Sequence, residues 1–462
     1  MKKHYFLYFF VLTSLFANTQ VEDIQFSNST YTYGTKPNNI LENDIYNAYT
    51  SWRNNFVAAC NNNRYRIKFD TETQTVSEGV AYGMLLSAFA NDKELFDGLW
   101  LYYSDFTNAN GVMNWKIEEC TSVIGENGAT DAELDAAYAL IVAHNKWGSS
   151  GEINYENDAL ELIEIIKNHE VEENTYVLKP GDAWGGSSNT NPSYFAPSYF
   201  RAFGIFSNDT VFWNEVANKS YSILNANLTV NNAYYNLVSD WCQADGSYSN
   251  EVDWATNAGQ TYNYDAARTP WRIALDYLWF GTEEALSYTS LCNSFVNEKG
   301  GFLNIYPGYT QSGVALNTSY KDPTFTGAYA AAAMSSSNQS FINSGYTELK
   351  NQITTAYFGA TLRVIYMFAL SGNMYSVVNN NALSVSNIKE LDIKVYPNPT
   401  SNFVNIKFKN VNNRVIKLYS IRGEQVLYKE SNAQNETIDI AKLPNGVYFL
   451  SIDNTMLKVV KK

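Results

Sequence analysis

Hydrophobic residues recur at helical spacing through most of the chain, most clearly in residues 78–90, 131–147 and 266–280. Long polar segments rich in Gly, Asn, Ser and Tyr separate these stretches, as in residues 181–197. From residue 23 to residue 373, the pattern predicts about 12 helices, each with its loop. Helices that alternate with long structured loops favour a helical barrel whose loops build a cleft at one end.

The pattern changes after residue 373. Residues 374–391 are rich in Asn, Ser and Val without a helical period, which predicts a linker. From residue 392 to residue 462, short β-rich runs such as FVNIKF, VIKLYS and GVYFLSI alternate with turn residues. Six or seven such strands predict a small all-β sandwich after the mainly α domain.

The first 19 residues have the pattern of a signal peptide. Two lysines precede an apolar run over residues 5–16, and residues 17–19 offer a small-residue cleavage site. The run is too short for a comfortable transmembrane helix. Export permits disulfides among the four cysteines, for which three pairings, or none, stay open. These are Cys60, Cys120, Cys242 and Cys292.

Composition narrows the classes of partner. The net charge is -14 without a basic cluster, so we expect neither nucleic acid nor an anionic membrane surface as a partner. The three histidines and the absence of CxxC pairs argue against a zinc site, and we expect no metal and no cofactor. All ten tryptophans lie between Trp52 and Trp279, where they are either stacking surfaces or core residues.

Two acidic residues stand at the start of predicted helices. Glu78 follows Ser77, a candidate N-cap, and Asp131 follows Thr130, which forms a T-x-x-E capping box with Glu133. Asp131 and Asp135 lie one turn apart on one face, and Asp135 is a candidate for a buried, bonded acid. Each acid could simply complement the helix dipole, which stabilises the anion. A general acid at position 78 would therefore need burial or a neighbouring carboxylate to keep its proton.

A third acid, Asp265, precedes Arg268 at i,i+3 spacing in YNYDAARTPW. The pair would keep Asp265 ionised, as a base requires, but it could also be an ordinary surface ion pair.

Several aromatic residues lie in loops beside Gly and Asn, a setting that suits the apolar faces and polar rims of sugar rings. They could instead serve loop packing. They are Trp115, Trp184, Tyr194 and Trp241.

Several long strings, in order, resemble glycoside hydrolase family 8, in particular its bacterial secreted endoglucanase branch. The likeness covers nearly all of residues 30–372. The strings are TVSEGVAYGMLLSAF, LFDGLWLYY, GATDAELD, ALIVAHNKWGSSGEINY, YVLKPGDAWGGSSNTNPSYFAPSYF, VSDWC and YDAARTPWRIALDYLWFG. The resemblance implies an (α/α)6 barrel with an open cleft and an inverting mechanism.

The resemblance also implies roles for single residues. Glu78 matches the proton donor and Asp265 the general base, while Asp131 matches an acid that contacts the sugar at the cleavage subsite. Other positions match residues that hold the attacking water and the base (Tyr194, Arg268) or stack on sugars (Trp115, Trp184, Tyr264). The chain departs from the family at Glu133, usually Asp, and at Ala136, often Ile. Because Glu133 fits a capping role, we expect little effect on catalysis.

The C-terminal strings VYPNPTSNFVNI, IKLYSIRGEQV, LPNGVYFLSI and LKVVKK resemble the type IX secretion sorting domain. The resemblance implies export across the outer membrane by the type IX machinery, often with removal of the domain. The alternative is a carbohydrate-binding sandwich, which the lack of Trp in this module disfavours.

Together these features predict a secreted, monomeric, inverting endo-acting hydrolase of β-1,4-linked polysaccharide, most consistent with cellulose-like or mixed-linkage β-glucan. Chitosan and xylan remain rival substrates, and a non-catalytic glycan-binding protein is the alternative of a different class.

Overall fold

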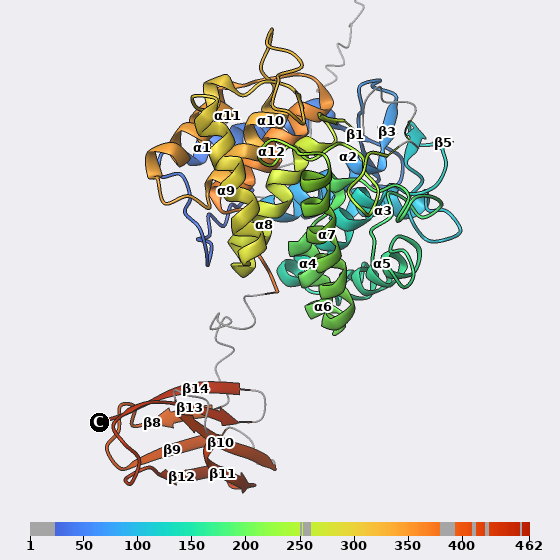
Figure 1. Cartoon of the computed structure of the whole chain (residues 1–462). Coiled ribbons are helices and arrows are strands. Elements are labelled where there is room, and N and C mark those ends of the chain that lie inside the picture. Colours follow the sequence, from blue (N-terminus) through green and yellow to red (C-terminus); the bar gives the residue numbers. More distant parts are fainter. Residues whose placement is uncertain are drawn as a thin grey trace, which may run out of the picture. The chain divides into compact units, whose positions relative to one another are not determined.

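The computed structural model describes residues 24–249, 252, 260–378, 393–408, 413–420, 425–452 and 455–462. The chain divides into two compact units, Met1–Asn379 and Asn380–Lys462 (Figure 1). The predicted signal peptide, residues 1–19, lies outside the described residues. Among the described residues, none of the helices has both the length and the apolar character needed to cross a membrane.

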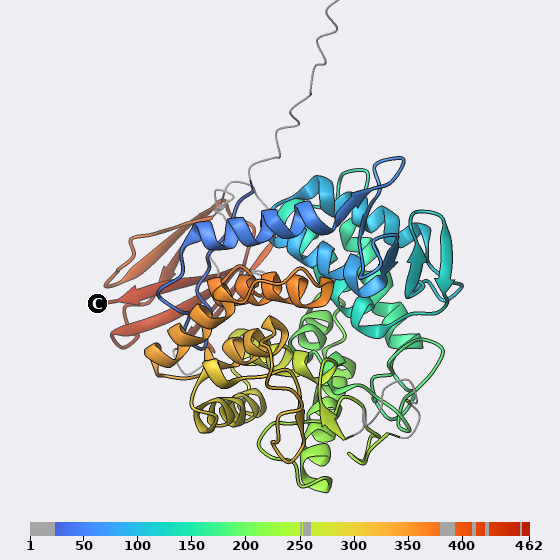
Figure 2. The ribbon, with the colours of Figure 1, turned by 90° about the horizontal axis from the view of Figure 1, so that it is seen from above.

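The first unit is a double ring of helices (Figure 2). Each inner helix contacts the next, and α12 contacts α2, so the ring closes. The inner helices are α2 (Ser77–Ala90), α4 (Thr130–Trp147), α6 (Pro197–Phe206), α8 (Thr269–Phe280), α10 (Pro323–Ala333) and α12 (Tyr357–Ser371). The outer helices are α1 (Glu42–Phe56), α3 (Lys93–Asp105), α5 (Tyr155–His169), α7 (Thr210–Val230), α9 (Glu283–Glu298) and α11 (Gln339–Asn351). Twelve α-helices in the described part of this unit confirm the predicted helical barrel.

Two of the inner helices, α2 and α10, are almost entirely buried because nearly every face meets other protein. In α2, every residue except Glu78 is buried, and α10 consists largely of small and aromatic residues that are all buried. A helix that is hydrophobic all round belongs in a core. The outer helices expose one polar face, as α11 does.

The predicted N-caps of α2 and α4 are wrong. Ser77 and Thr130 are already the first helical residues, and the N-cap positions are Val76 and Ala129, neither with a side-chain cap. Helix α2 starts where strand β3 (Gln74–Val76) ends, and the Ser77 N–H donates to a backbone carbonyl outside the helix. The neighbouring strands therefore set the helix start, and the side-chain oxygens of Ser77 and Thr130 cap nothing.

Short elements surround the mouth of the barrel. Strands β3, β4 (Lys116–Glu118) and β5 (Ser122–Gly125) form one antiparallel sheet. Two further antiparallel pairs are the hairpin of β1 (Val57–Ala59) with β2 (Tyr65–Ile67), and the pair of β6 (Thr261–Tyr262) with β7 (Tyr309–Thr310), which are separated in the chain by α8 and α9. The 3-10 helices are η1 (Pro192–Tyr194), η2 (Ala266–Arg268) and η3 (Phe302–Asn304).

The cysteines divide into one bridge and two buried thiols. Cys60 and Cys120 form a disulfide that links the β1–β2 turn to the β4–β5 turn. Cys242 and Cys292 are free and buried. The sequence left open three full pairings, or none, and the structure has a single bridge instead.

The predicted linker starts too early. Residues 374–378 pack on the barrel, where Met374 and Val377 are buried. The Trp279 indole donates to the Met374 carbonyl, and the Tyr138 hydroxyl donates to the Tyr375 carbonyl. The rest of the predicted linker, residues 379–391, lies outside the described residues.

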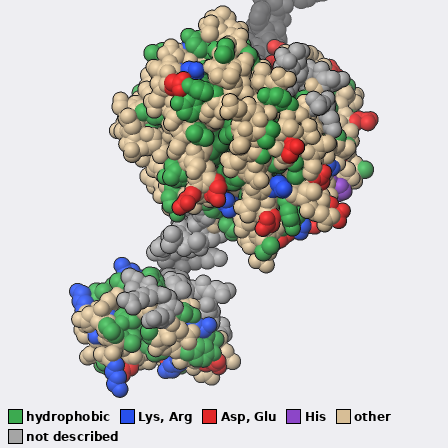
Figure 3. Space-filling model, viewed as in Figure 1, with side chains coloured by type: hydrophobic (Ala, Val, Ile, Leu, Met, Phe, Trp, Pro, Cys, Tyr) green, Lys and Arg blue, Asp and Glu red, His purple; other side chains and the backbone are tan. Residues whose placement is uncertain are grey.

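The second unit consists of two antiparallel sheets. One has the order β11-β10-β13-β14 and the other β12-β9-β8. The strands are β8 (Ile393–Tyr396), β9 (Phe403–Phe408), β10 (Arg414–Ser420), β11 (Gln425–Ser431), β12 (Asn435–Asp439), β13 (Gly446–Ile452) and β14 (Thr455–Lys461). Alternate residues such as Ile416, Leu418 and Leu450 form the apolar core between them. On the face drawn in Figure 3, basic side chains of this unit lie around its edge, whereas charges on the barrel are scattered.

Candidate active site

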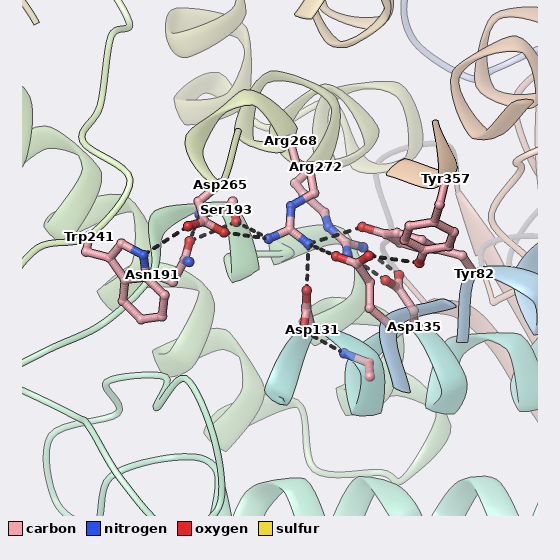
Figure 4. Close-up of polar contacts among 12 residues, drawn as sticks. Tyr82, Asp131, Asp135, Asn191, Ser193, Trp241, Asp265, Arg268, Arg272 and Tyr357 are labelled. Atoms are coloured by element: carbon pink, nitrogen blue, oxygen red, sulfur yellow. Dashed lines mark hydrogen bonds and ion pairs between the residues drawn. The ribbon is translucent and has the colours of Figure 1, made fainter. Parts of the chain in front are cut away.

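One arginine, Arg268, lies at the centre of a carboxylate cluster (Figure 4). It ends η2, and its side chain is 2% exposed. Nη1 donates to Glu78 Oε2 at 2.8 Å and to Asp131 Oδ2 at 2.5 Å, while Nη2 donates to Asp265 Oδ1 at 3.5 Å. The three acids that the sequence singled out therefore converge on one guanidinium from α2, from α4 and from the residue before η2.

Glu78 has the environment of a carboxyl that holds its proton near neutral pH. Burial raises its pKa to about 7, with support from the negative charges of Asp131 and Asp265 and against the opposing effect of Arg268. The Tyr357 hydroxyl, at the start of α12, donates to Glu78 Oε1 at 2.9 Å and also opposes the rise. Desolvation and like charge thus outweigh the anion-stabilising effect of the helix N-terminus.

Asp265 is the most solvent-accessible acid of the three, with 37% of its side chain exposed. The Trp241 indole N–H donates to Oδ2 at 3.0 Å, so both oxygens have a defined partner. Burial of the carboxyl raises the pKa of Asp265, while the Arg268 guanidinium and the Trp241 N–H oppose the rise. The i,i+3 pair with Arg268 exists, but Arg268 is buried, so the surface ion-pair alternative is wrong.

A second ion pair lies one helical turn below the first. Arg272 forms two hydrogen bonds of 2.6 Å with the two oxygens of Asp135, and both side chains are fully buried. Asp131 and Asp135 on α4 thus face Arg268 and Arg272 on η2 and α8, as a ladder with two rungs (Figure 4). The expectation of a buried, bonded Asp135 is confirmed.

The cluster opens into a pocket of about 540 Å³ at the end of the barrel where inner helices α2, α4, α10 and α12 begin. Its lining combines carboxylates with aromatic rings. The lining residues are Phe69, Asp70, Val76, Ser77, Glu78, Trp115, Ala129, Asp131, Tyr194, Tyr264, Asp265, Asp322, Ala356, Phe358 and Gly359. Among the described residues, no group of three or more His, Cys, Asp and Glu side chains is arranged to hold a metal ion.

Three of the predicted aromatic residues line this pocket. Trp115 is 42% exposed. Tyr264 is held by its hydroxyl, which donates to Asp322 Oδ2 at 3.0 Å and contacts the Tyr320 hydroxyl. Tyr194 lies under the Arg268 guanidinium, which is 5.3 Å from the ring centroid.

Trp184 does not line the 540 Å³ pocket. Its ring stacks on Trp241 with centroids 5.5 Å apart. Trp184 is half-buried, whereas Trp241 is buried and bonds to Asp265. The two indoles form a layer that begins at the carboxylate cluster and extends away from it.

A family model described as glycosyl hydrolases family 8 matches residues 38–372. The chain belongs to this family. A second model, the secretion system C-terminal sorting domain, matches residues 394–462. The C-terminal β unit is therefore a sorting domain, which indicates type IX secretion and extracellular export.

Several named relatives of the family 8 domain are endoglucanases, and others are exo-oligoxylanases. Endoglucanase 2 of Ruminiclostridium josui is 36% identical over 426 residues, which cover 85% of this chain and 89% of the relative. Endoglucanase A of Acetivibrio thermocellus is 37% identical over 391 residues, 81% and 77% of the two chains. The solved β-1,3-1,4-glucanase of Paenibacillus sp. X4 superposes with a TM-score of 0.69 at 30% identity and covers 76% of this chain and 99% of that one. The chain is thus a glycoside hydrolase of the endoglucanase type.

Sequence reasoning was wrong about Glu133. It does not cap α4, because its Oε1 accepts the Tyr103 hydroxyl at 2.9 Å inside the core. Its carboxyl is fully buried, and burial raises its pKa to about 8, with a contribution from Asp131. Glu170 is also fully buried, and burial raises its pKa well above the usual range, with a further contribution from the neighbouring carboxyl of Glu133.

Two other groups at the site were missed. Tyr357, which bonds to Glu78, is 279 positions away in the sequence, and no local pattern marks it. Asp240, which lies within the family string VSDWC, bonds to the backbone around Asp265. The spacing of Arg268 and Arg272, matched to that of Asp131 and Asp135, could have predicted the ladder.

Proposed function

We propose that the chain is an inverting endo-β-1,4-glucanase in which Glu78 is the general acid and Asp265 the general base. The observation that carries the proposal is the single guanidinium of Arg268 in contact with both carboxylates, with the pKa of Glu78 raised to about 7. An acid and a base in separate environments on one cleft are what inversion requires.

The reaction follows from these positions. Glu78 donates its proton to the glycosidic oxygen as the bond to the anomeric carbon breaks. Asp265 accepts a proton from a water that attacks this carbon from the opposite face, which inverts the anomeric configuration. The contacts with one guanidinium limit Glu78 Oε2 and Asp265 Oδ1 to about 9 Å or less, which is compatible with the spacing of about 6.5–9.5 Å that leaves room for the water.

Asp131, Tyr194 and Arg268 complete the catalytic group in this proposal. Asp131 contacts the sugar at the cleavage subsite and supplies the like charge that keeps Glu78 protonated. Tyr194 and Arg268 hold the attacking water and orient the base. The support is that all three lie at the carboxylate cluster and that Tyr194 lines the pocket.

The aromatic residues Trp115, Tyr264 and Trp184 are proposed to stack on sugar rings. Trp115 and Tyr264 line the pocket itself, while Trp184 would receive a sugar farther from the cleavage point. The substrate class is cellulose-like or mixed-linkage β-glucan, in line with the names of the endoglucanase relatives.

Two measurements test this function. The purified barrel domain is given carboxymethyl-cellulose, lichenan, xylan and chitosan, and product sizes are followed with time. We expect rapid loss of chain length on the two glucans. Proton NMR of early products gives the anomer, which we expect to be α from a β-linked glucan. Glu78→Gln is expected to abolish hydrolysis with an unchanged fold. Activity on none of the four polymers, or near wild-type rates for Glu78→Gln, would refute the assignment.

For export, we propose that residues 1–19 are removed as a signal peptide and that the type IX secretion machinery binds residues 392–462. The enzyme then acts, as a monomer, outside the cell or on its surface. Deletion of residues 392–462 is expected to leave active enzyme behind the outer membrane. Fractionation of cells with an activity assay measures this, and unchanged extracellular activity would contradict it.

A further inference from the structure

The loop after α7 carries two buried side chains that act on Asp265 from outside the pocket. Asp240 is 5% exposed and Trp241 is 4% exposed, and neither lines the 540 Å³ pocket. Both nevertheless bond directly to Asp265 or to the turn that carries it. They come from a segment more than twenty positions earlier in the sequence, so no local turn rule predicts the contact.

Asp240 holds the backbone of that turn. Its Oδ1 accepts the backbone N–H groups of Asn263 at 2.9 Å and Ala266 at 2.7 Å, and its Oδ2 accepts the Thr261 hydroxyl at 3.2 Å. The backbone N–H of Asp240 also donates to the Thr261 carbonyl. One carboxylate thus ties residues 261–266 together from both sides of Asp265.

These bonds determine where the Asp265 side chain can go. Asp265 directly precedes η2, and its backbone already has helical angles, φ -67° and ψ -58°, so its carboxylate is not turned back onto the N–H groups of η2 as that of a capping Asp would be. Here the Ala266 N–H is taken by Asp240, and the Ala267 N–H is taken by the Asn263 carbonyl. Asp265 makes no side-chain cap bond, and its carboxylate is left to face the pocket.

Trp241 fixes the direction of the carboxylate itself. Its indole N–H donates to Asp265 Oδ2 at 3.0 Å, while Arg268 approaches Oδ1. The indole plane is in turn held by the stacked ring of Trp184.

We propose that Asp240 and Trp241 are positioning residues for the general base: Asp240 holds the backbone of residues 261–266 so that the Asp265 carboxylate faces the pocket, and Trp241 aims that carboxylate at the attacking water. The inference rests on the proposed role of Asp265.

The test compares Asp240→Ala, Asp240→Asn, Trp241→Phe and the double variant Asp240→Ala/Trp241→Phe in the full chain. The exposed Asp245 of the same loop is the matched control, because it makes similar bonds to the Ser247 N–H and hydroxyl. Initial rates on lichenan give kcat and KM, and thermal unfolding checks the fold of each variant.

Asp240→Ala is expected to lower kcat by about 10–100-fold with KM within about twofold of wild type, because a misaimed base affects the chemical step rather than binding. Asp240→Asn is expected to recover most of the rate, since its amide oxygen still accepts both backbone N–H groups. Asp245→Ala is expected to match wild type.

Trp241→Phe gives a readout that a purely structural role would not move. The lost N–H no longer stabilises the charged base, so the acidic limb of the kcat/KM profile shifts to higher pH. The titratable and charged groups that also interact with Asp265 stay unchanged in this variant; they are Arg268, Asp131, Asp240, Glu78 and Tyr194. The double variant is expected to lose less than the product of the single losses, since both act on one carboxylate.

The outcomes separate the two proposals. If Asp265→Asn is as active as wild type, the proposed base is wrong. If Asp265→Asn is inactive while Asp240→Ala keeps wild-type kcat, or if Asp240→Asn is as impaired as Asp240→Ala, the positioning role is wrong. The positioning role is also wrong if the acidic limb of the kcat/KM profile of Trp241→Phe stays in place. This measurement tests the role even if Asp240→Ala fails to fold.

Discussion

Replacing Asp131 by Asn tests whether neighbouring charge keeps the proton on Glu78. Asp131 Oδ2 and Glu78 Oε2 both contact Arg268 Nη1, at 2.5 Å and 2.8 Å, so these two oxygens are no more than about 5 Å apart. At an effective dielectric constant of about 20, two unit charges at this distance repel by roughly 3 kcal/mol, about two pKa units.

Asp131→Asn removes this repulsion and leaves Arg268 freer to stabilise the Glu78 anion. Both effects lower the pKa of Glu78 from about 7, so we expect a fall of about one to two units. Because the acid must be protonated to act, the basic limb of the kcat/KM profile should shift to lower pH by the same amount. The loss of the Asp131 contact with the sugar lowers the rate at every pH and leaves the position of the limb readable.

The assay is the pH dependence of kcat/KM on lichenan between about pH 4 and pH 9, with circular dichroism to verify the fold at each pH. Glu78→Gln serves as the background control, since it has no titrating acid at this position. A basic limb that stays in place, or that moves to higher pH, would refute the assignment of Asp131 as the charge that raises the pKa of Glu78.

Three further predictions concern stability. Arg272→Met leaves the Asp135 carboxylate buried and unpaired, which should lower the free energy of unfolding in urea by about 3–5 kcal/mol. The double variant Asp135→Leu/Arg272→Met should recover most of this loss, and equal losses of stability in the two variants would contradict the prediction. Burial raises the pKa of Glu133 to about 8, so the folded chain binds more protons than the unfolded chain, and stability falls as pH rises from about 4.5 to 8. Glu133→Gln should therefore flatten the decline of Tm over that range, and an unchanged slope would argue against it. Cys60→Ser/Cys120→Ser opens a loop with a sequence separation of 60 and should lower stability by about 2–4 kcal/mol, as measured by urea unfolding beside reduced wild type.

The helical barrel was predictable because its pattern is repeated. Long apolar stretches between polar loops mark inner helices such as α2 and α10, and period-3.6 hydrophobicity marks outer helices such as α11. The strands of the C-terminal unit were predictable for the same reason, because the alternation of apolar and polar residues is a local pattern. The linker boundary was misjudged because residues 374–378 lack a helical period, although Trp279 and Tyr138 bind their backbone.

Within the site, the local sequence pattern does not distinguish acidic residues that have different partners in the folded structure. Glu78, Asp131 and Glu133 all look like helix-start acids, and only the ring of inner helices distinguishes them. Glu78 and Asp131 meet Arg268, while Glu133 points to Tyr103. The ordered family strings supplied the candidates that periodicity could not. Neither periodicity nor the family strings predicted contacts between distant segments, such as that of Tyr357 with Glu78. The sequence around each residue does not indicate its partner.

The closure of the ring between α12 and α2 has a consequence for the order in which the chain becomes an enzyme. Glu78 lies on the first inner helix, and Tyr357 begins the last one. Both proposed catalytic carboxylates, Arg268 and Asp131 precede α12, yet the environment that keeps Glu78 dry and bonded is completed only when α12 docks. A chain truncated before α12 would lack the Tyr357 hydroxyl bond to Glu78 and the pocket wall formed by Phe358 and Gly359, and we expect it to be inactive. On this reasoning, activity is expected only in chains in which the last inner helix has docked against the first.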